Sequence, residues 1–371
     1  MADDAADLLA GLNPVQREAA SAPDGPLLIV AGAGSGKTRV LTHRVAYLIA
    51  ERGVSPFGLL AITFTNKAAG EMKERVAALV GPVARRMWVS TFHSACVRIL
   101  RREAPRLDIR SSFSIYDASD SDRLIKSVMK ELGVDPKRIP PRAVAASISD
   151  AKNRLMDAGL YADFAGNPWE KTIAKIYEEY QRRLTISSAM DFDDLIMRTV
   201  EIFDRFPDAL KHYQERFTHV LVDEFQDTNF AQARLATLLA GKWRNIFVVG
   251  DADQGVYSFR GATIKNLLDF ERDWPDAQVV TLEQNYRSTQ NILAAANAVI
   301  ENNLMRKPKS LWTQSAAGEL ITRYHAQNEH DEAGWVASEI EADTARGGIL
   351  LGSTPNSFIT DLMRRSESDA S

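Results

Sequence analysis

The sequence predicts an α/β fold built on a parallel sheet, with a helical insertion in the middle of the chain. Three observations support this prediction. Short, unbroken apolar runs alternate with helical patterns, as expected when helices cover both faces of a parallel sheet. A glycine-rich turn follows the first apolar run, at residues 31–38. The alternation stops between about residues 114 and 190, where one helical pattern follows another.

Six apolar runs are expected to form the strands of this sheet. The runs are unbroken rather than alternating, which indicates strands that are buried on both faces. Helical patterns at 37–53 and 66–81 follow the first two runs, and strand–helix–strand units of this kind cross over with a right-handed turn. The expected strands are 26–30, 59–64, 87–90, 218–224, 245–251 and 278–282.

The insertion and the last third of the chain are expected to be mainly helical. Helical patterns cover 120–133, 141–159 and 168–186 within the insertion. After Thr281 the chain is expected to leave the first domain. A helix is expected over 287–303, with Ser288 or Thr289 near its cap, and a strand-like patch follows at 319–325.

Composition limits the kinds of site that the chain can carry. The chain has 371 residues, enough for two or three domains, and a net charge of −4, so any nucleic-acid site must be local. The single cysteine, Cys96, excludes a disulfide framework within one chain and a multi-cysteine zinc site. The first residues are acidic where a signal peptide is basic, and no apolar run approaches about 18 residues. We therefore expect a soluble, cytoplasmic protein.

The glycine-rich turn predicts a phosphate-binding loop. In such a loop the backbone N–H groups and the dipole of the following helix hold phosphates. Lys37 is expected to reach the β- and γ-phosphates, and Thr38 is expected to hold Mg²⁺. The strict pattern begins with glycine where this chain has alanine, and a turn without a ligand is the alternative. The loop residues are Ala31, Gly32, Ala33, Gly34, Ser35, Gly36, Lys37 and Thr38.

Two adjacent carboxylates, Asp223 and Glu224, end an apolar run at 218–224. Ligands of open α/β sheets bind at the carboxyl ends of strands. Asp223 is expected to hold Mg²⁺, directly or through water, and Glu224 to polarise an attacking water. The alternative is a solvated strand end with acidic capping residues. Together with the phosphate loop, the pair indicates a nucleoside triphosphatase.

Eight motifs occur in an order that resembles the superfamily 1 DNA helicases of the UvrD/PcrA/Rep type. The similarity covers roughly residues 10 to 340. It implies a RecA-like domain that hydrolyses ATP with Mg²⁺, binds single-stranded DNA and single/double-strand junctions, and travels 3′ to 5′ in DNA repair or replication. The motifs are LNPVQREA, AGAGSGKT, ITFTNKAAGEM, VSTFHSACVRIL, DFDDL, DEFQDT, GDADQGVYSFRGA and LEQNYRS.

The resemblance implies further nucleotide-binding residues. Gln16 corresponds to a glutamine that reads adenine, although a surface helix residue is the alternative. Tyr286 corresponds to a ring that stacks on adenine, and Arg39 is expected to cover the other face of the base.

Two more residues are implied in catalysis. Gln254 corresponds to the residue that senses the γ-phosphate, and Gly255 after it replaces the serine usual in the family. Arg287 corresponds to an arginine at the start of a second motor domain, which stabilises charge on the transferred phosphoryl group when the cleft closes. Its alternative is a pairing with Glu283.

For DNA the resemblance implies ring platforms and backbone contacts. Stacking tolerates any base, which suits a motor that moves along any sequence. The alternatives are ordinary core rings for Phe64 and Phe259 and a satisfied polar group for His93, to which we assign no metal. The expected platforms are Phe64, Tyr257 and Phe259, the expected backbone contacts are Thr63, Asn66, Thr91 and His93, and Arg260 is expected near the carboxylates and the DNA.

The resemblance also predicts a domain plan. Residues 1–113 and 191–280 form an ATP-binding motor domain, 114–190 a helical insertion domain, 281–343 part of a second motor domain, and 344–371 a tail unlike the family. Because a second phosphate-contacting arginine is missing, we expect weak nucleotide binding, slow hydrolysis and little unwinding. The alternatives are a non-motor fragment that binds ATP and DNA, and a phosphate-loop enzyme such as a small-molecule kinase.

Overall fold

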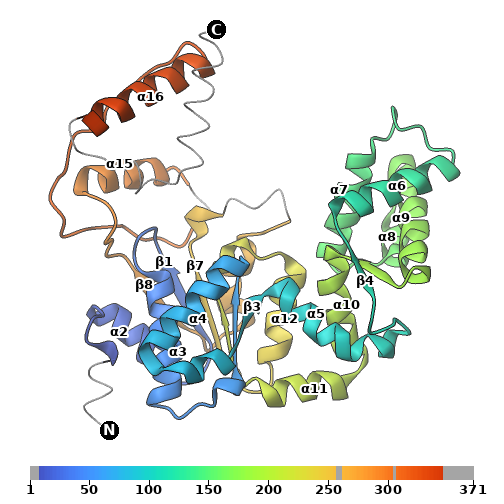
Figure 1. The fold of residues 1–371 in the computed structure, drawn as a ribbon, viewed down its shortest axis with the longest axis horizontal. Helices are drawn as coiled ribbons and strands as arrows, with labels where there is room; N and C mark the ends of the chain where they lie inside the picture. The colour runs from blue at the N-terminus through green and yellow to red at the C-terminus, as the bar shows by residue number, and fades with distance from the viewer. Residues whose placement is uncertain (1–7, 256–260, 304–305, 346–371) are drawn as a thin grey trace. The chain divides into compact units, whose positions relative to one another are not determined.

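The computed structural model describes residues 8–255, 261–303 and 306–345. By compactness the chain divides into two units, residues 1–316 and 317–371, which we describe separately. Figure 1 shows the elements of the fold. Among the described residues, no helix combines the length and the apolar character needed to cross a membrane.

A six-stranded parallel sheet forms the centre of the first unit, in the order β3-β2-β6-β7-β1-β8. All six expected strands are present in this sheet, so the predicted α/β fold is confirmed. Strand β1 lies between β7 and β8, which places the loop after β1 near the loops after both neighbours. The strands are β1 (Leu27–Ala31), β2 (Leu59–Thr63), β3 (Trp88–Thr91), β6 (His219–Val222), β7 (Ile246–Gly250) and β8 (Gln278–Leu282).

Helices cover both faces of the sheet, and alternate strand residues enter different cores. Leu27 and Ile29 of β1 pack in a core with α3 and α4. Leu28 and Val30 pack on the opposite face, in a core with α5, α10 and α12. This two-sided burial explains why the strand sequences are continuously apolar.

The helices of the first unit agree with the helical patterns of the sequence. Helix α9 spans residues 168–186 as expected, whereas the pattern at 141–159 ends earlier, at Asn153. The helices are α2 (Pro14–Ser21), α3 (Lys37–Ala50), α4 (Asn66–Val80), α5 (Phe92–Glu103), α6 (Ala118–Glu131), α7 (Pro141–Asn153), α8 (Ala158–Phe164), α9 (Pro168–Ile186), α10 (Phe192–Arg205), α11 (Pro207–Arg216), α12 (Phe230–Ala240), α13 (Lys265–Leu268), α14 (Phe270–Asp273) and α15 (Gln290–Ile300).

The helical insertion is confirmed and has its own apolar core. Helices α6, α7 and α9 supply residues such as Val128, Ile148 and Ile176 to it, and Figure 1 shows α6 to α9 gathered together. Two strands that the sequence did not predict, β4 (Ser114–Tyr116) and β5 (Ala189–Asp191), pair in parallel at the two ends of the insertion. This pair therefore fastens the entry of the insertion to its exit.

After β8 the chain forms a parallel bridge between Gln284 and Trp312, and α15 lies between these residues in the sequence. Thr289 is the N-cap of α15, as expected.

The second unit contains α16 (Glu329–Ala345). The strand-like patch at 319–325 is not a strand in the structure, so that prediction was wrong. Its apolar side chains remain exposed, with Leu320 at 87%, and no described strand pairs with the patch.

Candidate functional site

The glycine-rich loop connects β1 to α3 at the carboxyl edge of the sheet. Gly34 and Gly36 adopt left-handed backbone conformations, with φ of 68° and 88°. Helix α3 begins at Lys37 after Gly36, which has no side chain to cap the helix. The first N–H groups of α3 therefore have no capping side chain, and such groups bind anions.

Three side chains from different elements meet beside this loop. Lys37 Nζ lies 3.1 Å from Glu224 Oε2 and donates a hydrogen bond of 3.2 Å to Gln254 Oε1. Glu224 has a left-handed backbone, with φ of 48°, which is unfavourable for a residue with a Cβ and is often found at functional sites. This conformation lets Glu224 face Lys37, while Asp223 before it is more deeply buried.

Asp223 and Thr38 line the same cavity of about 380 Å³, which we call the carboxylate cavity; Phe64, Glu224 and Gln254 also line it. Burial, and then the charge of Glu224, raises the pKa of Asp223 to about 7. A carboxylate and a hydroxyl are oxygen donors of the kind that Mg²⁺ prefers. These residues therefore fit the magnesium ion that accompanies a nucleotide.

No group of three or more histidine, cysteine or acidic residues suited to a metal occurs in the part of the chain that the structure describes. Mg²⁺ at nucleotide sites commonly needs only one or two protein carboxylates besides phosphates and water. The fit of Asp223 and Thr38 is consistent with such a site.

The residues expected to contact the base lie around the same loop. Gln16 is buried rather than on the surface. Its Nε2 donates to the Ser35 carbonyl at 2.9 Å, and its Oε1 accepts from Asn13 N at 3.2 Å. The Tyr286 ring is half exposed and its hydroxyl contacts Asn13, while the Arg39 guanidinium donates to the Gly11 carbonyl at 2.7 Å. Their roles with adenine stay predictions.

The segment after β8 lies directly against the phosphate loop. Asn285 Nδ2 donates to the Ala33 carbonyl at 2.7 Å, and Tyr286 N donates to the Gly34 carbonyl at 2.9 Å. A Cβ added at Gly34 would come within 2.7 Å of Arg287 Cβ. The predicted catalytic arginine therefore starts beside the phosphate loop.

The alternative partner proposed for Arg287 is engaged elsewhere. Glu283 Oε1 accepts a hydrogen bond of 2.9 Å from Ser310 N. Arg287 is exposed, and no described residue forms an ion pair with its guanidinium. The contact between this arginine and a phosphoryl group stays a prediction.

A second cavity, of about 690 Å³, lies between the sheet and the insertion. We call it the aromatic cavity because Phe64, Phe92, His93 and Phe192 line it, with Thr63 and Thr91 beside them. Four of the residues expected to contact DNA therefore line this cavity together: Thr63, Phe64, Thr91 and His93. Asn66 Oδ1 accepts a 3.4 Å hydrogen bond from the Ser94 hydroxyl, and the Ser94 backbone N–H donates to Thr91, the N-cap residue of α5. Tyr257, Phe259 and Arg260 lie outside the described residues.

Sequence reasoning missed Phe192 as a site residue. Its ring is half exposed and meets the His93 ring edge-on, with centroids 5.8 Å apart. The available signal was an aromatic side chain at the first position of α10, inside the motif DFDDL. Burial lowers the pKa of His93, so its ring is neutral at neutral pH and presents no charge to the cavity.

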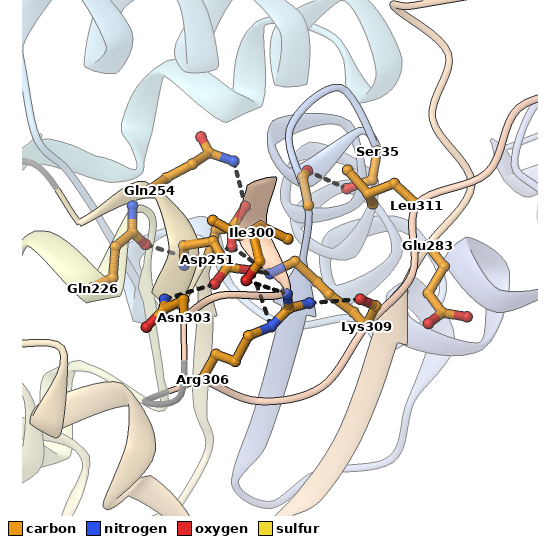
Figure 2. A network of polar contacts seen from close by, with 12 residues as sticks. Ser35, Gln226, Asp251, Gln254, Glu283, Ile300, Asn303, Arg306, Lys309 and Leu311 are labelled. Carbon is orange, nitrogen blue, oxygen red and sulfur yellow. Dashed lines mark hydrogen bonds and ion pairs between the residues drawn. The ribbon is translucent and has the colours of Figure 1, made fainter. Parts of the chain in front are cut away.

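Sequence reasoning also missed two cations beside Gln254. Lys309 contacts Asp251 and Asp253, and Arg306 lies 3.5 Å from Asp253 Oδ2. Figure 2 shows these side chains converging from the segment after α15 onto the loop after β7. The sequence signal, RKPK at residues 306–309, is a short basic run of the kind usually found on solvated surfaces.

Comparison with known proteins identifies two matching domain families. Residues 12–275 match the UvrD/REP helicase N-terminal domain, and residues 280–354 match the UvrD-like helicase C-terminal domain. The second match extends past residue 344, where the sequence-based domain plan starts its tail.

Similar proteins of known name agree with these matches. The chain is 53% identical over 333 residues to the ATP-dependent DNA helicase PcrA of Bacillus subtilis, covering 90% of this chain and 45% of that protein. It is 57% identical over 348 residues to the ATP-dependent DNA helicase UvrD1 of Mycobacterium tuberculosis, again covering 90% and 45%. The chain thus spans about half the length of these relatives.

Proposed function

Because the chain belongs to the UvrD/REP helicase family, we propose that it forms the ATP-binding part of a DNA helicase that moves 3′ to 5′ along single-stranded DNA. The observation that carries the proposal is the meeting of Lys37, Glu224 and Gln254 beside a loop with unfilled helix N–H groups. This arrangement suits phosphoryl transfer, in which positioning and electrostatic stabilisation supply most of the catalysis.

Each residue of the nucleotide site has a proposed task. The loop N–H groups and Lys37 hold the phosphates, and Glu224 orients and polarises the attacking water. Thr38 and Asp223 hold Mg²⁺, which, when bound, neutralises charge on the phosphates. Gln254 contacts the γ-phosphate, while Gln16, Arg39 and Tyr286 hold the base.

The Lys37–Glu224 pair gives these tasks an order. Without nucleotide, each residue partially neutralises the other at 3.1 Å. Phosphate binding would draw Lys37 away from Glu224, whose Oε2 would keep its hydrogen bond from Gln226 Nε2. The Glu224 carboxylate would then lose its neutralising cation and accept hydrogen bonds from water more strongly.

We propose that Arg287 couples hydrolysis to movement. The residue follows β8, and its backbone lies against the phosphate loop, so a small change at the phosphates reaches the segment that begins there. We assign residues 281–343 to part of a second motor domain, 1–113 and 191–280 to the first, and 114–190 to the insertion.

Single-stranded DNA is the proposed occupant of the aromatic cavity. Rings that line an open cavity can stack on bases of any sequence, at about 1–3 kcal/mol per base. Phe64 lines both this cavity and the carboxylate cavity, which gives the DNA and the catalytic groups a shared side chain. This feature favours a DNA-dependent ATPase over a small-molecule kinase.

ATP turnover by the purified chain, with and without single-stranded DNA, tests the proposal. We expect DNA to stimulate turnover, and Arg287→Ala to reduce the stimulated rate by roughly 10³-fold or more. Arg272→Ala is a matched control, since Arg272 forms an exposed ion pair with Asp269 and should leave the rate unchanged. Binding of ATP and DNA without any turnover would instead favour the non-motor alternative. Strand displacement on duplexes with a 3′ or a 5′ tail tests the direction.

A further inference from the structure

Four charged side chains form a buried cluster beside the nucleotide site. The Lys309 side chain is 3% exposed and contacts both Asp251 and Asp253, with its Nζ 2.6 Å from Asp251 Oδ1. Arg306 lies 3.5 Å from Asp253, and Asn303 donates to Asp253 Oδ1 at 3.1 Å. The two carboxylates and two cations balance, as buried charges must. The cluster joins the loop after β7 to the segment after α15 (Figure 2).

Asp251 transmits this cluster to Gln254. Its Oδ1 accepts from Lys309 and from Asp253 N, and its Oδ2 accepts from Gln254 Nε2. Because the Gln254 amide nitrogen is held by Asp251, the amide oxygen faces Lys37 Nζ, 3.2 Å away. A chain of direct contacts therefore runs from Lys309 through Asp251 and Gln254 to Lys37.

The backbone of Asp251 is held from another side. Its N–H donates to Gln226 Oε1 at 2.9 Å, and Gln226 Nε2 donates to Glu224 Oε2 at 2.9 Å. With its backbone fixed, the remaining freedom of Asp251 is rotation of its carboxylate. Lys309 and the Asp253 backbone N–H both contact Oδ1 and together restrict this rotation, and Lys309 is the member of the pair that belongs to the segment after α15.

Stability alone does not explain a buried cluster of this kind. Apolar side chains of similar volume often stabilise a fold as well as buried ion pairs do. An ion pair does, however, fix the direction of a carboxylate, which a methyl group cannot do. The carboxylate of Asp251 also accepts a hydrogen bond from Gln254, so its direction determines how the Gln254 amide is oriented.

We propose that Lys309 is a positioning residue, which sets the Gln254 amide for the terminal phosphate by fixing the Asp251 carboxylate. The inference rests on the proposed binding of nucleotide phosphates by Lys37. It makes nucleotide recognition dependent on a side chain 55 positions beyond Gln254, in the segment that we assign to the second motor domain. Movement of that segment would release Asp251 and with it the γ-phosphate contact.

The test measures nucleotide affinity of the full chain by calorimetry, with ATPγS and with ADP. Loss of an orienting contact to a charged group should reduce the preference of Lys309→Met for ATPγS over ADP by on the order of tenfold. Affinity for ADP should stay unchanged, because ADP has no γ-phosphate. Lys309→Arg should recover most of the preference. Lys307→Met is the matched control. Lys307 lies on the same segment as Lys309, but it pairs with Glu271 of α14 and not with Asp251.

Double variants separate positioning from general damage. The double variant that carries Gln254→Ala and Lys309→Met should show the same preference for ATPγS over ADP as the single variant Gln254→Ala. Both changes remove the same contact, so the second change should add no further loss. Should Lys309→Met not fold, Asp253→Asn with Lys309→Met removes one charge of each sign and tests the same step. Independent, additive losses in the double variant would overturn the inference.

The outcomes also distinguish this inference from the proposed function. A wild-type chain that prefers ATPγS, together with a folded Lys309→Met that keeps the full preference, would overturn the inference and leave the proposed function intact. A wild-type chain with no affinity for either nucleotide would overturn both.

Discussion

Lys152→Met should destabilise the chain strongly, because this lysine is the only described cation in contact with both Asp191 and Asp194. Its Nζ lies 2.6 Å from Asp191 Oδ2 and 3.0 Å from Asp194 Oδ1, and its side chain is fully buried. Burial lowers the pKa of Lys152, but the two carboxylates outweigh burial and raise it, so the lysine remains charged. The variant would leave two carboxylates facing each other without this cation.

The size of the effect follows from which contacts remain. Asp191 keeps a hydrogen bond of 2.9 Å from the Tyr180 hydroxyl, and Asp194 Oδ2 keeps one of 3.2 Å from Gln181 Nε2. Without Lys152, however, Asp194 Oδ1 has no hydrogen-bond donor among the described residues. Arg198 Nε is more distant, at 3.8 Å from Asp194 Oδ1. Removing one partner of a buried ion pair costs about 3–5 kcal/mol. This is a large part of the about 5–15 kcal/mol that stabilises a typical domain.

Urea unfolding monitored by circular dichroism measures this cost. Lys126→Met is the control, since Lys126 pairs with Asp122 at 2.6 Å on the same insertion, but both side chains are exposed. We expect the control to cost less than about 1 kcal/mol. Because the Lys152–Asp191 and Lys126–Asp122 distances are equal, a difference between the variants reports burial and the second carboxylate that Lys152 contacts, and not the length of the ion pair. Equal and small effects of both substitutions would refute the reasoning.

Three further predictions concern the two cavities and the phosphate loop. Phe64→Ala should weaken binding of single-stranded DNA by about 1–3 kcal/mol for any sequence, and fluorescence anisotropy with two unrelated oligonucleotides would expose a sequence-dependent loss instead. Burial, followed by the charge of Asp191, raises the pKa of Asp193 to about 6, so the stability contributed by this group is full below about pH 4 and is lost as the pH rises through about 6. Asp193→Asn should therefore gain stability relative to wild type as the pH rises from about 4 to about 6, and a constant difference in urea midpoints over this range would contradict this. Gly36→Ala should cost about 1–2 kcal/mol and weaken nucleotide binding, because φ is 88° and the new Cβ would lie 2.7 Å from a side-chain amide; Gly70→Ala, which meets nothing within 4 Å, is the control.

The sequence predicted the sheet well because its strands carry a strong physical signal. Strands such as β1 and β7 are buried on both faces, so their sequences are continuous apolar runs that end in polar turns. The strands β4 and β5 have three residues each and carry no such pattern. They are strands because the insertion brings them together, and only the tertiary structure contains that information.

The patch at 319–325 shows the opposite error. It has apolar and β-branched residues, but a strand also needs a neighbour to receive its backbone hydrogen bonds. Local composition indicates only that a segment is suited to a sheet. The described residues provide no partner strand, and the patch stays irregular.

The candidate site divides in the same way. Lys37 and Glu224 were found from motifs in which residue types and spacing are fixed by phosphate chemistry, and Gln254 from the family resemblance. The structure brings the three side chains together. Lys309 and Phe192 were missed because a basic residue or an aromatic residue at a helix start has many ordinary uses. Only their neighbours across the fold, and not their neighbours in the chain, place them beside the candidate site.

The position of β8 at the edge of the sheet has a mechanical consequence. Neighbouring parallel strands are about 4.8 Å apart, so the pairing of Ala31 with Leu282 fixes the distance between the end of β1 and the end of β8. The position at which the segment after β8 begins is therefore fixed by backbone pairing and not by a flexible loop. An extra residue inserted after Leu282 would move Asn285 and Tyr286 away from the Ala33 and Gly34 carbonyls that they contact, and so separate the segment after β8 from the phosphate loop.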